Sequence, residues 1–407
     1  MAVRIELRRD AGKIDPRRVR WIRRRQVARV LGPPDPSALA CVVDHRDRIL
    51  GHGLYSPDSS ILVRLICAGE APPPADWFER RLAAALARRA RLGLGQGESS
   101  ETTGYRELNS EGDGVPGLVL DRFADWRVIQ ITTAAIDARA EALLAWLRSE
   151  APVAGGQIVL RPEAAATREG FVAGARVESG GPSGGEIAGP ERLHWRERGL
   201  RFEAPAPPAQ KTGAYHDQRD NRAHFAALAC AGIGADRPRV LDLGCHVGGF
   251  ALAAAARGAE VVAVDQSTRA LEYVARNAAL NGLEARVTAV AADMFGPLED
   301  PALAGPFDAL IFDPPKIASS QRDVGRATRA MTRSLRALIG RVTEGGLVGL
   351  CSCSHHLGWS ALDTVMLDAS PGATRVARWG PGVDHPVAPG HEQGEYLRVA
   401  VYTHHRR

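Results

Sequence analysis

The chain is 407 residues long, with 45% hydrophobic and 24% charged residues, a composition typical of a soluble globular protein with two or three domains. No apolar run approaches the roughly 18 residues of a membrane span, and the amino terminus, MAVRIELRRDAGKID, lacks the apolar core of a secretory signal. The six cysteines are scattered apart from one close pair, so they need no disulfide framework and predict a reducing cytoplasm.

The net charge of +5 is concentrated at the start of the chain. Residues 1–70 carry 14 basic and 8 acidic side chains, and residues 1–31 alone carry 11 basic and 3 acidic ones. Each contact between a basic side chain and a phosphate adds salt-sensitive affinity for nucleic acid. The segment therefore predicts contact with nucleic acid, and a solvated basic face is the alternative.

Residues 38–67 are predicted to form short strands joined by turns. The apolar runs ALACVVD, ILGHGLYS and ILVRLI are separated by HRDR and PDSS, a spacing typical of a small β-barrel or sheet. A helix is predicted next in WFERRLAAALARRARLGL, whose apolar residues recur at intervals of three and four. Residues 105–160 then mix strands with a helix, and the Gly-, Ser- and Pro-rich run at 178–191 indicates a flexible hairpin or linker.

From about residue 238, apolar strands alternate regularly with helices. Strands are predicted in PRVLDLG, EVVAVD, ARVTAVAAD, FDALIFD and GLVGLCS, and a long helix around 325–341. This alternation predicts a parallel, doubly wound α/β sheet, in which ligands bind beyond the carboxyl ends of the strands. The residues just after each strand are therefore the candidates for a functional site.

The first of these strands leads into a glycine-rich loop that contains Asp242, Gly244 and Gly248. Glycines let the backbone approach a ligand closely, and the helix that follows presents its positive end there. The spacing differs from the G-x-G-x-x-G of dinucleotide sites and fits the D-x-G-x-x-x-G of methyltransferase loops. A purely structural glycine turn is the alternative.

Acidic residues also end the next two strands. Asp265 is placed to accept hydrogen bonds from both hydroxyls of a ribose, and Asp293 from an adenine amino group. Either acid alone is equally well explained as a helix N-cap. Three acids at the ends of three successive strands, with Asp242 as the first, favour a common cofactor site.

The fourth strand runs into Asp313-Pro314-Pro315-Lys316. Prolines stiffen the loop and remove backbone donors, so they fix what the aspartate presents. D-P-P and N-P-P loops at this position are typical of methyltransferases that hold a planar base near the transferred methyl group. We therefore expect Pro314, Pro315 and Lys316 to bind substrate.

The fifth strand ends in Cys351-Ser-Cys353-Ser-His-His. Methylation at carbon 5 of a pyrimidine needs a nucleophile, because a thiolate that adds to carbon 6 makes carbon 5 able to attack a sulfonium methyl group. A cysteine at a strand end that faces the cofactor suits this chemistry, and Cys353 is the favoured candidate over Cys351. The alternatives are two packed core cysteines, or a zinc site whose ligands are spaced unusually closely.

These stretches resemble the bacterial RlmI-like ribosomal RNA (cytosine-5) methyltransferases, which join a PUA domain and a small α/β linking domain to a Rossmann-like methyltransferase. The resemblance covers residues 38–398, and the matching stretches are VVDHRDRILGHGLYSPDSS, RELNSEGDGVPGLVLDRF, QKTGAYHDQRDNR, VLDLGCHVGGFALAAAARG, DQSTRALEYVARNAALNGL, FDALIFDPPK, CSCSHHL, DHP and EYL. The most specific of them is QKTGAYHDQRDNR.

The resemblance implies that QKTGAYHDQRDNR closes over the cofactor, and it matches the family's catalytic cysteine with Cys353. The residues alone indicate a polar loop that opens a helix whose amino end can meet a carboxylate. The resulting expected cofactor site comprises Lys211, Gln218, Arg219, Asn221, Asp242, Gly244, Gly248, Asp265, Gln266, Asp293, Met294 and Asp313.

The chain departs from the family pattern in two places. A Gly-His-Pro-Trp-Val-Phe-like segment near the start is replaced by residues 16–21, Pro-Arg-Arg-Val-Arg-Trp. The Arg-Gly-Tyr-Lys segment that follows the D-P-P loop in the family is replaced by residues 329–332, Arg-Ala-Met-Thr. The second departure bears on the target nucleotide more than on the cofactor.

The expected architecture is α/β, with a PUA-like RNA-binding domain at 1–72, an α+β linking domain with a hairpin at 73–192, and a Rossmann-like class I methyltransferase domain at 193–407. The expected activity is formation of 5-methylcytosine in large-subunit ribosomal RNA, with S-adenosyl-L-methionine as cofactor, Cys353 as nucleophile and Asp313 as the second catalytic residue. We expect no metal and no membrane association, and leave a homodimer open.

Two other functions remain open on the sequence. One is methylation of a different nucleotide position or another substrate, with the cysteine idle. The other is an RNA-binding assembly protein whose methyltransferase core is vestigial.

Overall fold

The computed structural model describes the chain apart from residues 1–2, 13, 96–99, 209–211, 232–236 and 406–407. The chain separates into two compact units, which are described one at a time. Unit 1 comprises Met1–Leu193, Pro205–Ala214 and Asp384–Gly394. Unit 2 comprises His194–Ala204, Tyr215–Val383 and Glu395–Arg407.

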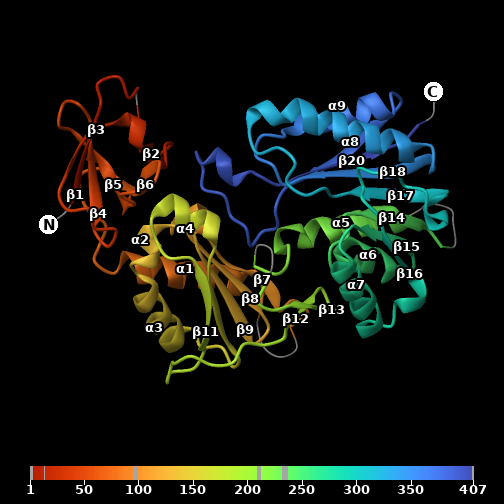
Figure 1. The fold of residues 1–407 in the computed structure, drawn as a ribbon, viewed down its shortest axis with the longest axis horizontal. Coiled ribbons are helices and arrows are strands. Elements are labelled where there is room, and N and C mark those ends of the chain that lie inside the picture. Colours follow the sequence, from red (N-terminus) through yellow and green to blue (C-terminus); the bar gives the residue numbers. More distant parts are fainter. Residues whose placement is uncertain (1–2, 13, 96–99, 209–211, 232–236, 406–407) are drawn as a thin grey trace. The chain divides into compact units, whose positions relative to one another are not determined.

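Unit 1 begins with a six-stranded sheet in the order β2-β6-β5-β4-β1-β3 (Figure 1). Its strands are β1 (Val3–Leu7), β2 (Trp21–Arg23), β3 (Val27–Leu31), β4 (Leu39–Val43), β5 (Ile49–Tyr55) and β6 (Ile61–Ala68). The last three were predicted, whereas β1 was not, although Val3, Ile5 and Leu7 alternate as buried residues along it. The basic first segment thus supplies three strands of a folded sheet.

The second sheet of unit 1 has the order β11-β10-β9-β8-β7. Its strands are β7 (Gly104–Asn109), β8 (Leu118–Phe123), β9 (Trp126–Ile131), β10 (Gly156–Arg161) and β11 (Gly174–Ser179). The helices of this part are α1 (Trp77–Arg91), α2 (Ala134–Asp137), α3 (Ala140–Glu150) and α4 (Glu163–Glu169). The apolar faces of α1 and α3 pack with this sheet in one core, as their three- and four-residue periodicity predicts.

A buried ion pair joins the first sheet to α4. The Arg64 guanidinium on β6 lies 2.7 Å from the Glu169 carboxylate, and both side chains are less than 10% exposed. The hydroxyl of Ser59 and the backbone N–H of Ala134 also donate to Glu169. Because these donors compensate the buried charge, the pair fixes the contact between the first sheet and α4.

The segment Asp384–Gly394 belongs to unit 1, although it was predicted to lie in the third domain. The backbone carbonyl of Asp384 accepts from Arg89 at 2.6 Å, and its carboxylate accepts from the backbone N–H of Arg106 at 2.9 Å. Arg89 is itself paired with the buried Asp113 at 2.7 Å. These long-range polar contacts, which no local sequence pattern encodes, attach the segment to unit 1.

Unit 2 is built on a seven-stranded sheet in the order β16-β15-β14-β17-β18-β20-β19. Its strands are β14 (Arg239–Leu243), β15 (Glu260–Asp265), β16 (Val287–Ala291), β17 (Phe307–Phe312), β18 (Val342–Ser352), β19 (Thr374–Trp379) and β20 (Arg398–Thr403), and β12 (Arg192–Glu197) pairs with β13 (Leu200–Pro205) in a separate two-stranded sheet. The pairs from β16 to β18 are parallel, as predicted, and β20 is antiparallel to β18 and β19.

Helices cover both faces of this sheet, which gives the doubly wound α/β arrangement that was predicted (Figure 1). They are α5 (Arg219–Cys230), α6 (Gly249–Ala255), α7 (Thr268–Leu280), α8 (Val324–Ile339) and α9 (Trp359–Ala369). α8 and α9 share one core with β14, β17, β18 and β20. Among the described residues, no helix is both long and apolar enough to cross a membrane.

The buried ion pair leads to a stability prediction for unit 1. Replacing Glu169 by Ala leaves Arg64 buried without its carboxylate, so we expect a loss of about 3–5 kcal/mol in the free energy of unfolding. The matched control is Glu141→Ala, because Glu141 pairs with Arg176 at 2.5 Å on the surface and the expected loss is about 0–1 kcal/mol. Urea unfolding of the full chain measures both, and equal losses would contradict the prediction.

Candidate active site

The loops after β14 and β17 are in close contact through their backbones. The N–H of Asp313 donates to the carbonyl of Leu243 at 2.9 Å, and the next residue, Gly244, has a left-handed φ of 86°. A Cβ at Gly244 would lie only 2.3 Å from the carbonyl oxygen of Asp313. Glycine is therefore needed here both for its backbone conformation and for the close approach of the two loops.

Asp242 lies beneath the glycine loop and is fully buried. One carboxyl oxygen accepts from the N–H of Ala251 in α6 at 2.9 Å, and the other has no hydrogen-bond partner within the described part of the chain. Burial raises the pKa of Asp242 to about 8, and the negative charge of Asp313 adds to this effect. The carboxyl thus holds a proton at neutral pH and ties α6 to β14, while its contact with a cofactor stays a prediction.

Asp265 ends β15 in a fixed orientation. Its carboxylate accepts from the N–H of His246 at 3.0 Å and from the N–H of Ser267 at 2.9 Å. The side chain is half-buried, and each carboxylate oxygen has a second lone pair for another donor. Two adjacent hydroxyl groups suit such a carboxylate. The neighbouring Gln266 is exposed.

The third strand end places its two candidates differently. Met294 is buried, and a Cβ at Gly244 would lie 2.7 Å from the methyl carbon of Met294, so this side chain packs against the glycine loop. Asp293 is exposed and accepts from the N–H of Phe295 in its own loop at 2.9 Å. The structure therefore brings Met294 to the site, and the role of Asp293 stays a prediction.

The segment before α5 holds Asp313 in place. The side-chain amide of Gln218 donates to the Asp313 carboxylate at 3.1 Å, and Asn221 donates to the Gln218 carbonyl at 2.7 Å. Gln218, Arg219 and Asn221 are all buried, and Arg219 lies 3.5 Å from the carboxylate of Asp220. Lys211, which was expected to join this group, lies outside the described residues.

Tyr215 lies among these groups and was not singled out from the sequence. Burial raises the pKa of its hydroxyl to about 12, and the charges of Asp313, Cys353 and Asp265 add to the rise. Its ring meets the ring of His246 edge-on at 5.0 Å. Only its position within QKTGAYHDQR hinted at a role, because an aromatic residue in a polar loop is unremarkable by itself.

The two cysteines at the end of β18 have different environments. Cys351 is fully buried, and burial raises the pKa of its thiol well above the ordinary value, with the negative charge of Asp313 adding to the rise. Cys353 follows the strand and is half-buried. The next residue, Ser354, donates from its hydroxyl to the carbonyl of Ala318 and so ties this strand end to the segment after the D-P-P loop.

The zinc alternative for these cysteines gains no support. Among the residues that the structure describes, no group of three or more His, Cys, Asp or Glu side chains is placed to hold a metal ion.

The D-P-P loop exposes two of its residues to solvent, since Pro315 and Lys316 are exposed, whereas Pro314 is buried. Asp313 is half-buried between them and the glycine loop.

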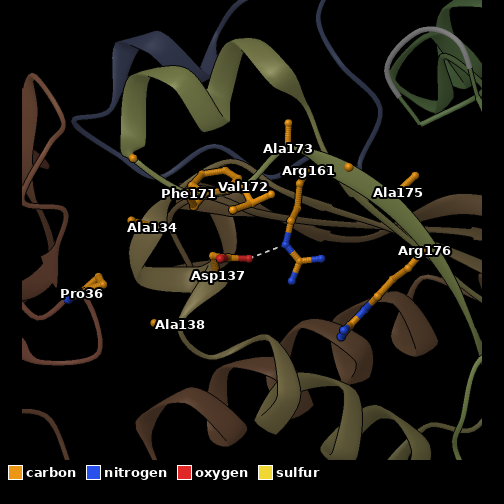
Figure 2. A pocket seen from close by; sticks show the side chains of 12 residues that line it. Pro36, Ala134, Asp137, Ala138, Arg161, Phe171, Val172, Ala173, Ala175 and Arg176 are labelled. Atoms are coloured by element: carbon orange, nitrogen blue, oxygen red, sulfur yellow. Dashed lines mark hydrogen bonds and ion pairs between the residues drawn. The ribbon is translucent and has the colours of Figure 1, made fainter.

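Unit 1 contains a separate open pocket of about 570 Å³ (Figure 2). Its two arginines are already paired, Arg161 with Asp137 at 2.5 Å and Arg176 with Glu141 at 2.5 Å. Figure 2 shows the first of these pairs inside the pocket. Because carboxylates hold both guanidinium groups, the pocket offers little free charge to an anionic ligand, and we assign it no function.

The glycine loop leads to a prediction for Gly244→Ala. The variant combines an unfavourable left-handed backbone with a clash against a backbone oxygen, so the loops after β14 and β17 must separate. Gly258→Ala is the matched control, since Gly258 has a φ of 97° and nothing within 4 Å of a new Cβ. We expect Gly244→Ala to lose about 1–3 kcal/mol more than the control in urea unfolding, and equal losses would rule out the close contact.

The pKa of Asp242 leads to a pH prediction. Since this pKa is raised in the folded state, the folded protein holds a proton that the unfolded chain releases between about pH 4 and pH 8. Stability therefore falls as the pH rises through this window. In Asp242→Asn that proton is absent, so the variant should gain up to about 1.4 kcal/mol per pH unit relative to wild type between pH 5.5 and 7.5. Parallel stability curves from urea unfolding would contradict this.

Comparison with known families places the chain clearly. A PUA-like domain model matches residues 5–67, and a methyltransferase domain model matches residues 240–337. A ribosomal RNA large subunit methyltransferase from Deinococcus radiodurans is 35% identical over 387 residues, which cover 93% of this chain and 92% of the relative. Ribosomal RNA large subunit methyltransferase I from Shewanella amazonensis is 32% identical and covers 98% of this chain and 99% of the relative.

Solved structures share the fold. A candidate SAM-dependent methyltransferase from Streptococcus mutans has a TM-score of 0.77 at 19% identity, covering 99% of this chain and 100% of the other. A candidate methyltransferase in complex with SAH has a TM-score of 0.78 at 19% identity, with the same coverage. With its PUA-like domain and its Rossmann-like, S-adenosylmethionine-dependent methyltransferase domain, the chain belongs to the ribosomal RNA large subunit methyltransferase I family.

Proposed function

We propose that this protein methylates carbon 5 of a cytosine in large-subunit ribosomal RNA through a covalent adduct with Cys353. The observation that carries the proposal is the half-buried Cys353 thiol at the end of β18, near Tyr215 and in a site with Asp313. The names of the relatives and the PUA-like domain support ribosomal RNA as the substrate. The enzyme would act in the cytoplasm.

The residues of the site fit S-adenosylmethionine. When bound, this cofactor supplies a methyl group made electrophilic by its sulfonium sulfur. The glycine loop at the end of β14 carries no side chain at Gly244 or Gly248, which lets a ligand approach its backbone, and the fixed carboxylate of Asp265 suits two ribose hydroxyls. We assign cofactor binding to the glycine loop, to Asp265 and to the other residues predicted for it, which are Lys211, Gln218, Arg219, Asn221, Asp242, Gln266, Asp293, Met294 and Asp313.

Cys353 would act as the nucleophile in two steps. Its thiolate adds to carbon 6 of the cytosine, and carbon 5 then attacks the methyl group. Transfer of the proton from carbon 5 to a base, for which water suffices, restores the double bond and expels the thiolate. Cys351 is unsuited to this role, because its buried thiol keeps its proton at neutral pH.

Asp313 would stabilise the adduct. Addition of the thiolate increases the electron density on the ring nitrogen next to the exocyclic amine, and Asp313, once its carboxyl group has taken up a proton, would donate a hydrogen bond that stabilises that charge. Gln218 holds the Asp313 carboxyl in one orientation, so little rearrangement is needed at the moment of reaction. The Tyr215 hydroxyl stays protonated at neutral pH and is a second hydrogen-bond donor in the site.

The base must leave its stack to reach this site. Unstacking costs a few kcal/mol, and contacts with the D-P-P loop offset it. In this proposal, Pro314 and Pro315 contact the planar base, and the exposed ammonium of Lys316 contacts a neighbouring phosphate.

The proposal predicts the behaviour of Cys353→Ala. Without the nucleophile, methylation of a large-subunit ribosomal RNA transcript should fall by a factor of about 10³ or more, while S-adenosylmethionine binding stays unchanged in calorimetry. Wild type should form a denaturation-resistant adduct with RNA that contains 5-fluorocytosine, because fluorine replaces the proton that must leave. The matched control is Cys351→Ala, which should still form the adduct.

Two outcomes would redirect the proposal. Full activity of Cys353→Ala would favour methylation of another position, such as an exocyclic amine, with the D-P-P loop as the main substrate contact. The observation that favours this second function is the Arg-Ala-Met-Thr sequence at 329–332, which replaces the Arg-Gly-Tyr-Lys segment of the family and bears on the target nucleotide. Absence of S-adenosylmethionine binding by wild type would instead favour an RNA-binding assembly protein.

A further inference from the structure

We propose that the exposed side of α8 is an RNA-binding surface of unit 2, which contacts RNA phosphates beside the methylation site. The surface, called here the arginine face, consists of Arg326, Arg329, Arg333 and Arg336. The proposal rests on RNA being the substrate, and it assigns RNA affinity to a part of the molecule outside the PUA-like domain.

The arginine face follows from the periodicity of α8. Its members are spaced by three, four and three residues, so they lie on one side of the helix over about 15 Å of its length. The opposite side carries Ala327, Met331, Leu335 and Leu338, which are all at most 2% exposed in the core of unit 2. Burial of that side fixes the rotation of the helix, and all four arginines are exposed.

The positive charge of this surface is poorly neutralised. α8 contains neither Asp nor Glu, and Arg329 and Arg333 have no ion pair or hydrogen bond to any residue that the structure describes. Arg326 pairs with Asp323 at 2.8 Å in solvent, and Arg336 donates to the backbone carbonyl of Asp368. An exposed ion pair is worth little, so a phosphate can readily displace Asp323.

The basic start of the chain is different, because several of its arginines are already paired. Arg4 pairs with Asp47, Arg17 with Asp15 at 3.1 Å, and Arg29 lies 3.5 Å from Glu6. The formal charge of residues 1–31 therefore overstates the unpaired charge of that segment, although these exposed pairs add little stability and a phosphate can displace them as it can displace Asp323. The arginine face carries fewer charges, and a larger share of them is free.

The position of α8 links the arginine face to the substrate loop. α8 begins eight residues after Lys316, and the segment between them is anchored at the candidate active site by the hydrogen bond from Ser354, next to Cys353, to Ala318. The hydroxyl of Ser320 donates to Asp323 at 2.9 Å and closes a capping box just before the helix. In this proposal, an RNA strand whose base enters beside Asp313 continues from the amino end of α8 over the exposed side of the helix.

The character of the arginine face favours nucleic acid over a membrane. Helices that lie on membranes expose large apolar side chains to the lipid, whereas the large apolar residues of α8 are in the core. Arginine donates in a planar fork that matches phosphate oxygens, and a row of such donors binds the backbone without reading sequence. We therefore assign the surface to RNA phosphates.

The test compares two double variants with equal loss of charge. The first is Arg329→Ala with Arg333→Ala. The control is Arg201→Ala with Arg257→Ala, two exposed residues of unit 2 whose side chains have no ion pair or hydrogen bond within the described part of the chain. Arg257 follows the carboxyl end of α6, at the opposite edge of the sheet from the site. Binding of a large-subunit ribosomal RNA transcript is measured as a function of salt, with methylation kinetics alongside.

We expect the first variant to bind RNA about 10-fold more weakly at 0.1 M salt and to reduce the slope of log K against log salt by about 1.4–1.8, since each phosphate contact contributes about 0.7–0.9. KM for RNA should rise in parallel while kcat at saturating RNA, S-adenosylmethionine binding and the unfolding midpoint stay unchanged. Arg329→Lys with Arg333→Lys should restore the salt slope, because lysine keeps the charge.

Equal RNA affinity and equal salt slope in the two double variants would overturn the proposal. If wild type methylates RNA and only this comparison fails, the arginine face is wrong and the proposed function stands. If wild type neither binds nor methylates the RNA, both proposals are wrong.

Discussion

The contact between Gly244 and the backbone of Asp313 is the constraint on which the candidate site depends. It brings the loops after β14 and β17 together so closely that no Cβ fits between them. The glycine loop, which we propose binds the cofactor, and the D-P-P loop, which we propose contacts the base, are thereby fixed at one edge of the parallel sheet. Gln218 then reaches from the start of α5 to hold the Asp313 side chain. Positioning in this site thus rests on backbone geometry first and on side-chain hydrogen bonds second.

Side chains of the same chemical type differ in burial at this site, and they therefore differ in their chemical state. Asp242 and Asp265 both belong to neighbouring strands, yet one is fully buried with a raised pKa and the other is half-buried with both oxygens hydrogen-bonded to backbone N–H groups. Cys351 and Cys353 differ in the same way, because one is still within the strand and the other has just left it. A shift of one or two residues along a strand therefore decides whether a group supports the fold or faces a ligand.

Local patterns were sufficient to predict the methyltransferase sheet, and they singled out the candidate site residues that follow its strands. The apolar strands are short and strongly periodic, and the acids and glycines follow them directly, so Asp265, Gly244 and Asp313 were found from spacing alone. Strand β1 was missed because it is only five residues long and its arginine and glutamate were counted as part of the basic first segment. The segment Asp384–Gly394 was misplaced because its partners, Arg89 and Arg106, lie far away in the sequence.

The sequence also does not show which charged side chains are paired, because pairing depends on contacts between residues that lie far apart in the chain. Counting residues pointed to the first 31 positions, but a count does not show which charges are already paired, and pairing depends on contacts such as Arg29 with Glu6 across two strands. On α8 the helix period alone places the arginines on the solvent side, and the helix itself contains no acid to pair with them, although Arg326 pairs with Asp323 just before it. A regular helix with an apolar core side is thus a more dependable guide to free charge than a dense but folded basic segment.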